Sequence, residues 1–306
     1  MQRPPYDATA HQTGSGILRA IGLMCLTWAF FACLDSAGKY LIVIKGLPAA
    51  QVVWVRFLGQ FLAIVSVLGL MVIPRLLVTQ KLPMQLFRSL LLLGSTAFNF
   101  LALRHMRLDQ TTTIGFLVPL TVALLAGPVL GEWVGWRRLL AILVGFCGIL
   151  IAMRPGVGTF QPAFLLAFGT VACSSIFSLV TRYLAAYDPP EVTLFYSLLA
   201  GTFLVAPFAL ADWVWPAAAW DWVLLLSMGF FGALGHYVFI VAHRYAPAST
   251  IAPFAYIALL THSTMGYLVF DQLPDRYTLV GAAVVIASGL YLLHRERVIM
   301  RARRAG

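Results

Sequence analysis

The sequence predicts an all-α integral membrane protein whose ten transmembrane helices form two inverted five-helix repeats. Of the 306 residues, 61% are hydrophobic and only 10% are charged, and the mean hydropathy is +0.88. These values lie far outside the range of soluble domains. Ten apolar runs approach the length of about 20 residues that a helix needs to cross a bilayer. Landmarks in the first five runs recur in the last five at a nearly constant offset.

The ten predicted spans are separated by short connections that contain Gly, Pro or charged residues. The predicted limits are 18–44, 48–73, 85–105, 109–130, 136–153, 162–185, 190–212, 219–243, 247–270 and 275–294. A polar tail (1–17) precedes them, a basic tail (295–306) follows, and residues 18–156 and 162–294 make up the two repeats. No small-residue cleavage site follows the first apolar run, so we expect this run to remain in the protein as its insertion signal.

The basic residues predict the orientation of the spans. Of the 21 Lys and Arg residues, fourteen fall on the side of the amino terminus and five on the opposite side, while Lys39 and Arg56 lie within spans. Cytoplasmic loops carry the excess of positive charge. We therefore expect both termini in the cytoplasm, with the protein in the bacterial inner membrane. The basic tail then serves as a topology anchor that contacts anionic lipid, and no nucleic-acid partner is expected.

Five landmarks repeat between the two halves. The matched pairs are Lys39-Tyr40-Leu41 with Arg182-Tyr183-Leu184, Pro48 with Pro190, Ala102-x-Arg104 with Ala242-x-Arg244, Glu132 with Asp271, and Gly148 with Gly289. An odd number of spans in each half places the halves in opposite orientations. This arrangement is typical of secondary transporters, which bind solute near the midplane between the repeats.

The hairpin of the first two spans carries charge deep in apolar sequence. Asp35 and Lys39 are four residues apart, so they share a helix face and can pair. If the chain turns near Lys45–Pro48, Asp35 and Arg56 lie at the same depth, where an ion pair would hold Arg56 in place. Charges inside a bilayer cost at least about 2.5–3.5 kcal/mol each. We therefore interpret this hairpin as one wall of a solute path.

Arg56 and Asn99 are the foremost candidates to bind solute. The planar fork of Arg56 suits a carboxylate or a phosphate, although a structural ion pair with Asp35 is an equal alternative. Asn99 needs several hydrogen-bond partners inside a membrane. Lys39 is a further candidate, with snorkelling to the interface as its alternative.

Aromatic residues and histidines supply the remaining candidates. Trp54 suits stacking on a planar or cationic solute, with helix packing or lipid contact as the alternative. Tyr196 falls near the position that corresponds to Arg56. His236 and Tyr256, together with His262, lie in late spans, and such a histidine either carries a coupling proton or is a neutral core residue.

Gating residues are predicted in and after the fourth span. Pro119 predicts a hinge or kink, because a proline frees backbone carbonyls in mid-helix. Glu132 and Arg137 could form a closing ion pair, with topology and helix-end charge pairing as the alternative. The cysteines Cys25, Cys33, Cys147 and Cys173 lack paired spacing, which indicates reduced thiols. No metal and no cofactor is expected.

The sequence resembles the drug/metabolite transporter superfamily, in its EamA-type ten-helix branch. The resemblance rests on Asp35…Lys39-Tyr40-Leu41, Arg56, Arg88, Ala102-Leu103-Arg104, Pro119, Gly131-Glu132, Trp136-Arg137-Arg138, Val144-Gly145-Phe146-Cys147-Gly148 and Arg154-Pro155-Gly156. It extends from about residue 18 to 294, and Asp271-Gln272 departs from the acidic pattern expected in the second half. The resemblance implies a carrier of amino acids, S-adenosylmethionine or riboflavin.

Other functions are weaker alternatives. An exporter of drugs or toxic metabolites uses the same architecture, and a lipid flippase would need a long apolar groove. An embedded enzyme around Asp35, Arg56 and His236 is a remote alternative, because the sequence contains no nucleophile elbow, P-loop or zinc motif. We therefore predict no enzymatic activity, a small-molecule solute, the bilayer as a partner and protons as a candidate coupling ion. The sequence does not determine the oligomeric state.

Overall fold

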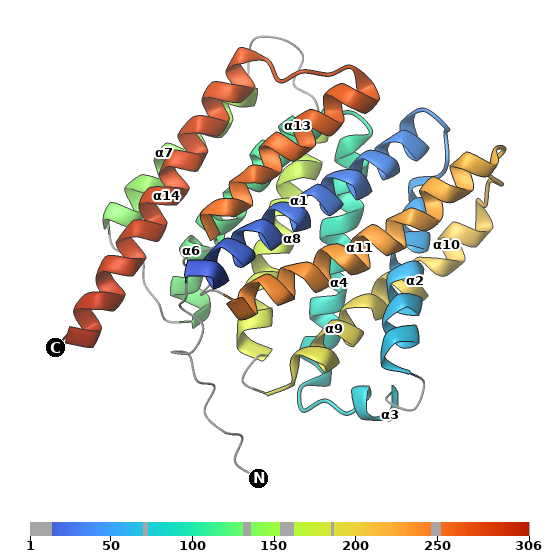
Figure 1. Cartoon of the computed structure of the whole chain (residues 1–306), viewed down its shortest axis with the longest axis horizontal. Helices are drawn as coiled ribbons and strands as arrows, with labels where there is room; N and C mark the ends of the chain where they lie inside the picture. Colours follow the sequence, from blue (N-terminus) through green and yellow to red (C-terminus); the bar gives the residue numbers. More distant parts are fainter. Residues whose placement is uncertain are drawn as a thin grey trace.

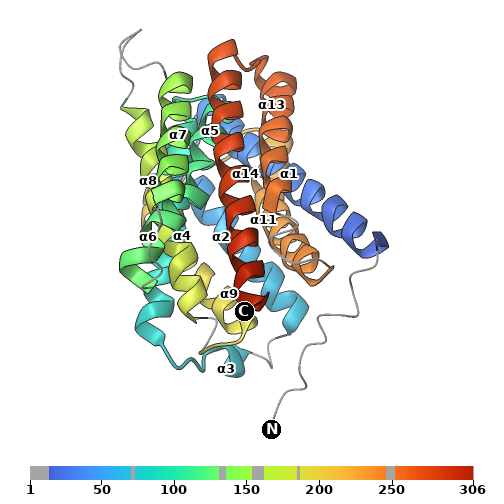
Figure 2. The same ribbon diagram turned by 90° about the vertical axis from the view of Figure 1, so that its left-hand side faces the viewer.

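Helices make up all the regular structure in the described ranges of the computed structural model, which are residues 14–69, 73–130, 136–153, 162–184, 187–245 and 252–305. The helices are α1 (Gly14–Val43), α2 (Ala49–Leu68), α3 (Ile73–Leu76), α4 (Leu82–Leu103), α5 (Leu108–Gly115), α6 (Leu117–Leu130), α7 (Trp136–Met153), α8 (Ala163–Leu184), α9 (Pro190–Leu199), α10 (Ala206–Ala211), α11 (Ala219–Tyr245), α13 (Ile257–Phe270) and α14 (Arg276–Ala305). They form one bundle (Figures 1 and 2).

Six of the described helical segments are long and apolar enough to cross a membrane. They are Leu18–Val43, Ala49–Val67, Leu82–Leu103, Ala163–Thr181, Glu191–Ala211 and Ala219–Phe239. Shorter apolar helical segments cover Leu139–Ala152, Phe254–Phe270 and Arg276–Tyr291. The chain is therefore a multi-pass membrane protein.

Several predicted spans are interrupted in ways that the apolar pattern did not reveal. The fourth span divides at Phe116 into α5 and α6, because Pro119 has no N–H to donate to the Gly115 carbonyl. The seventh divides at a π-helical turn, Ala200–Leu204, and the ninth begins with a 3₁₀ turn, Ala252–Tyr256. At the chain's end, α14 continues to Ala305, well beyond the predicted limit of the tenth span.

Glycines allow the closest helix contacts. A Cβ on Gly59 of α2 would lie 2.8 Å from the Cα of Gly229 on α11, so these backbones touch. A Cβ on Gly148 of α7 would lie 2.8 Å from the carbonyl oxygen of Gly281 on α14. Small residues of this kind let helices approach closely in membranes, where tight packing drives association. The pair α7 and α14 forms one edge of the bundle (Figure 1).

Much of the bundle's core is built around α1 and α8. Helix α1 packs along α11 and α13, while α8 packs along α4 and α6. In Figure 1, α1 rises from the lower left to the upper right and α14 descends to the lower left. At the upper end, Lys45 forms an ion pair with Asp221 at 3.1 Å, which joins the end of α1 to the start of α11.

Candidate solute-binding site

The carboxylate of Asp35 lies where α1, α4 and α13 meet. Its Oδ1 accepts a hydrogen bond from Asn99 Nδ2 of α4 at 3.3 Å, and its Oδ2 lies 3.3 Å from His262 Nε2 of α13. The His262 side chain is 5% exposed and that of Asp35 is 21% exposed. Because a carboxylate inside a membrane requires polar partners, these two contacts explain how α1 tolerates Asp35.

A glycine brings α4 against α1 at this point. The ring of Phe100 lies over Gly38, where an added Cβ would be 2.1 Å from the ring. Phe100 is completely buried. Asn99 is its neighbour on the chain, so this close approach positions the amide beside the Asp35 carboxylate one turn away on α1.

Arg56 extends from α2 toward α4 rather than toward Asp35. Its Nη1 donates a hydrogen bond to Thr96 Oγ1 at 2.8 Å, and its guanidinium lies 5.5 Å from the ring centre of Phe57 and 5.9 Å from that of Phe100. Its Nε is buried and has no hydrogen-bond partner. The guanidinium therefore retains donor capacity that a solute anion can use.

The predicted ion pair between Asp35 and Arg56 is wrong. Within the part of the chain that the structure describes, the ion pair of Asp35 is with His262. Counting residues from the turn gives the depth of each side chain in its helix, but it does not give the direction in which each faces. Asp35 faces α13 and α4, and the partner of Arg56 is a hydroxyl group.

Lys39 does not pair with Asp35, so that expectation is wrong, while its snorkelling to the interface stays a prediction. Its ammonium donates to the Met106 carbonyl at 2.8 Å and to Gln272 Oε1 at 3.2 Å, and it lies 4.8 Å from the centre of the Phe270 ring. The residue is 4% exposed. The Lys39 ammonium therefore lies buried between the loop after α4 and the loop after α13, and one neutral oxygen from each loop accepts its hydrogen bonds.

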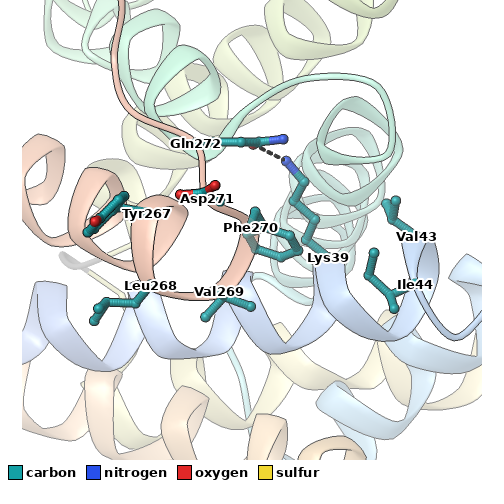
Figure 3. Close-up of a pocket in the computed structure, with 9 residues that line it drawn as sticks. All are labelled: Lys39, Val43, Ile44, Tyr267, Leu268, Val269, Phe270, Asp271 and Gln272. Carbon is teal, nitrogen blue, oxygen red and sulfur yellow. Dashed lines mark hydrogen bonds between the residues drawn. The ribbon is translucent and has the colours of Figure 1, made fainter.

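Lys39 also contributes to a pocket of about 620 Å³ between the ends of α1 and α13. Figure 3 shows the ammonium directed toward Gln272, with Phe270 beside it and with Val43 and Ile44 at and just after the end of α1. The pocket is completed by Tyr267, Leu268, Val269 and Asp271. Lys39 is one helical turn from Asp35, so this pocket lies next to the polar group.

Trp54 and Tyr196 are held by helix contacts away from Asp35. The Trp54 indole N–H donates to the Thr202 carbonyl at 2.8 Å, which anchors α2 to the π-helical turn. The Tyr196 hydroxyl donates to the Leu77 carbonyl at 2.8 Å, between α9 and the end of α3. The structure therefore does not bring these two predicted residues together with Asp35.

His236 and Tyr256 pack against aromatic rings on neighbouring elements. His236 of α11 makes an edge-to-face contact with Phe31 of α1, with ring centres 5.2 Å apart. Tyr256 contacts Phe116 in the same geometry at 5.0 Å, at the break between α5 and α6. Both lie beside helices that form the site, yet the structure records no hydrogen bond from either to Asp35.

The predicted gating residues are described only in part. Pro119 is an exposed residue of α6, three positions after the break at Phe116. Glu132 lies outside the described residues. Arg137 is in the first turn of α7, and its side chain is likewise outside the described part. Their role in gating stays a prediction.

Sequence reasoning missed a second polar network, near the starts of α4 and α9. Asp188 accepts hydrogen bonds from the Thr79 hydroxyl, the Gln80 backbone N–H at 3.0 Å and Gln85 Nε2 at 2.8 Å. Burial opposes ionisation of this carboxyl, but the three donors outweigh it, so the pKa of Asp188 lies below its ordinary value. Nothing in the local sequence signalled the network, because its members are up to 109 residues apart.

Arg88 extends this network into the bundle. Its Nε donates to Thr181 Oγ1 at 2.7 Å, and its Nη1 donates to the Thr193 carbonyl at 3.0 Å and to Ser197 Oγ. Its guanidinium stacks 4.2 Å from the ring centre of Phe177. This network therefore joins α4, α8 and α9 at one end of the bundle.

Comparisons with known proteins agree with a transport function. Residues 161–294 match the model of the EamA-like transporter family. The riboflavin transporter of Vibrio cholerae is 30% identical over 271 residues, which cover 87% of this chain and 90% of that protein. The S-adenosylmethionine uptake transporter of Rickettsia prowazekii is 25% identical, covering 69% of this chain and 71% of its own length. The pseudopaline exporter CntI of Pseudomonas aeruginosa is also 25% identical, over 92% and 97% of the two chains.

A solved crystal structure shares the fold. It superposes with a TM-score of 0.61 at 18% sequence identity, and the match covers 92% of this chain and 98% of that one. Together with these relatives, the membrane-length helices define a multi-pass transporter of small molecules. The chain belongs to the EamA-like transporter family of drug/metabolite transporters, as its sequence predicted. It is accordingly a secondary transporter of small metabolites and not an enzyme.

Proposed function

We propose that this protein carries a small zwitterionic or planar metabolite across the bacterial inner membrane by alternating access between two inverted five-helix halves. The observation that carries the proposal is the polar group of Asp35, Arg56, Thr96, Asn99 and His262. These side chains come from α1, α2, α4 and α13, so both predicted halves contribute to one site. Solute held there would lie between the parts that must move.

The helix contacts support the inverted repeat. The predicted repeat pairs α1 with α8, α2 with α9, α4 with α11, and α5 and α6 with α13. When each helix is replaced by its counterpart, the contact of α1 with α11 becomes the contact of α8 with α4, and both contacts are extensive. In the same way, the contact of α2 with α11 becomes that of α9 with α4, and the contact of α1 with α13 becomes that of α8 with α6. The pair α7 and α14 exchanges with itself. A two-fold relation between the halves accounts for all four correspondences.

Candidate solutes follow from the relatives and from the site. Riboflavin, S-adenosylmethionine and amino acids are the first compounds to test, because two relatives are named for the first two. The Arg56 guanidinium suits a carboxylate, and the rings of Phe57 and Phe100 lie beside it. One relative is named an exporter, so transport should be measured in both directions.

Replacing Arg56 with alanine should weaken solute binding about ten- to a hundredfold, the loss expected for hydrogen bonds to a charged group. The measurement is thermal stabilisation of the purified protein by each candidate solute, followed by uptake into proteoliposomes. A ligand present at about 100 times its dissociation constant stabilises the folded protein by about 2.7 kcal/mol. The Arg56→Ala protein should insert into membranes normally yet lose about half or more of this stabilisation.

Arg276→Ala is the matched control, because Arg276 is an exposed arginine that contacts Tyr277 at the start of α14. It should bind and transport like the unmodified protein. An Arg56→Ala protein that binds and transports normally would exclude Arg56 from the site. One that fails to insert would assign Arg56 a structural role.

A further inference from the structure

The contact between Asp35 and His262 requires a proton. His262 Nδ1 lies 2.8 Å from the carbonyl oxygen of Ala258, one turn earlier on α13. A carbonyl only accepts hydrogen bonds, so Nδ1 carries a hydrogen. His262 Nε2 then faces Asp35 Oδ2 at 3.3 Å with either a second hydrogen or a lone pair.

The contact between Asp35 and His262 is favourable only when the pair holds one added proton. If Asp35 is ionised and His262 is neutral, two acceptors face each other in a site that is largely out of water. One added proton resolves this conflict, either as an imidazolium that donates to a carboxylate or as a carboxylic acid that donates to Nε2. Asn99 donates to Oδ1 in both cases, so it directs the shared proton to Oδ2.

Other titratable and charged groups near the pair have partners of their own, and of these Arg56 also interacts electrostatically with Asp35. Lys39 of α1 donates to Met106 and Gln272. Asp109 of α5 forms an ion pair with Arg107 at 2.6 Å. On α2, α11 and the 3₁₀ turn, Arg56 donates to Thr96, while His236 and Tyr256 pack against aromatic rings.

The shared proton changes the charge of the site. Without it, Asp35 and Arg56 sum to zero, and with it the group of Asp35, His262 and Arg56 carries one positive charge. An anionic group of a solute beside Arg56 is therefore favoured when the proton is bound. The 21% exposure of the Asp35 side chain gives the proton access to the pair.

We propose that the Asp35–His262 pair is the proton-binding site of this carrier, which holds one proton and takes it up together with the anionic group of its solute. The linkage to solute rests on the proposed transport function. Because α1 and α13 belong to different predicted halves, a proton shared by Asp35 and His262 links the two halves. When the proton is released, Asp35 Oδ2 and His262 Nε2 are both acceptors and repel each other. Thr261 of α13, which donates to the Trp28 carbonyl of α1 at 3.3 Å, keeps the helices adjacent when that happens.

The first test uses infrared difference spectra of the purified protein in lipid vesicles, titrated with pH in the absence of solute. When the spectra of Asp35→Asn are subtracted from those of the unmodified protein, one titrating proton with carboxyl and imidazole bands should remain. Asp35→Asn should fold normally, because Asn still accepts from Asn99 and donates to a neutral His262, yet it should lose the titration. His262→Gln should also lose it, since Gln donates to the carboxylate without an added proton.

Asp271→Asn is the control for replacing an aspartate in this region. Asp271 is exposed at the end of α13 and has a φ of 53°, a backbone conformation that asparagine tolerates. This variant should retain the titration. An unchanged titration in Asp35→Asn or His262→Gln would overturn the proton site.

The second test measures accumulation of S-adenosylmethionine, riboflavin and amino acids in proteoliposomes with an imposed proton gradient. The gradient should drive accumulation by the unmodified protein and should have no effect on Asp35→Asn. Transport by the unmodified protein that ignores the gradient would overturn the coupling. A protein that carries none of these probes would count against the proposed function, while the infrared titration still decides the proton site.

Discussion

At the scale of residues, the buried cations differ in how many of their donors are satisfied. An arginine fork carries five N–H donors. Arg88 uses its Nε and Nη1 on three neutral oxygens and stacks on an aromatic ring, and Lys39 donates to two neutral oxygens. Arg56 makes one hydrogen bond, and its Nε has no partner. This difference supports the proposal that Arg56 binds an anionic solute, whereas Arg88 and Lys39 fasten helices.

The Asp188 network predicts a pH-dependent contribution to stability. Since hydrogen bonds hold the pKa of Asp188 below its ordinary value, the ionised carboxyl stabilises the folded state above the unfolded-state pKa of about 3.9. This contribution is lost as the pH falls through the lower, folded-state pKa. Asp188→Asn should lower the free energy of unfolding by about 1–3 kcal/mol at neutral pH, because its amide would face the donors of Thr79 and Gln85.

The measurement is the melting temperature of each protein in detergent between acidic and neutral pH. Asp188→Asn should be less stable at neutral pH and should lose part of the dependence on acid. Asp212→Asn, at an exposed aspartate after α10, is the control and should melt like the unmodified protein. Equal melting curves for Asp188→Asn and the unmodified protein would show that the network does not stabilise the fold.

At the scale of elements, length and hydropathy predicted where most helices lie but not where they break. The apolar runs correspond closely to α1, α2, α4, α7, α8 and α11. Pro119 signalled the break at Phe116. The π-helical turn Ala200–Leu204 lies just before Pro207, which has no N–H to donate to the Phe203 carbonyl. The Phe57 ring against Gly201 and the Trp54 hydrogen bond to Thr202 also contact this turn. Such tertiary contacts are not encoded in the periodicity of one segment.

The crossing of α2 and α11 should be sensitive to one added methyl group. A Cβ on Gly229 would lie 2.6 Å from the Cα of Gly59, and neither backbone can move without shifting its helix. Gly229→Ala should therefore cost about 1–3 kcal/mol of stability, the usual penalty for overpacking. Thermal denaturation of the purified protein measures this cost.

Gly22→Ala on α1 is the matched control, because nothing lies within 4 Å of a Cβ placed there. Alanine favours a helix over glycine by about 1 kcal/mol, so this variant should be as stable as the unmodified protein or slightly more so. If Gly229→Ala behaves in the same way, the backbones of α2 and α11 are not in contact.

At the scale of the whole molecule, the sequence predicted which polar residues lie inside the bundle better than it predicted their partners. Asp35 and Asn99 do come together, and His262, one of several polar residues noted in late spans, joins them. The pairing of Asp35 with His262 depends on α1 lying against α13, and these residues are 227 positions apart. Hydropathy gives the depth of each residue, whereas the packing of the bundle decides which residues face one another.

The distribution of basic residues makes a prediction about the whole molecule that can be tested at two loops. If both termini are cytoplasmic, the connection between α3 and α4 is inside the cell and the connection between α10 and α11 is outside, since a membrane span separates successive loops. Val78 is 72% exposed in the first connection and Ala217 is exposed in the second.

A membrane-impermeant maleimide added to spheroplasts should label Ala217→Cys and leave Val78→Cys unmodified. The natural cysteines lie on helices α1, α7 and α8, where a water-soluble reagent does not reach them. Permeabilised spheroplasts should label both variants, which confirms that both thiols react. Labelling of Val78→Cys alone in intact spheroplasts would invert the orientation, and the network of Asp188 and Arg88 would then lie at the outer end of the carrier instead of the inner one.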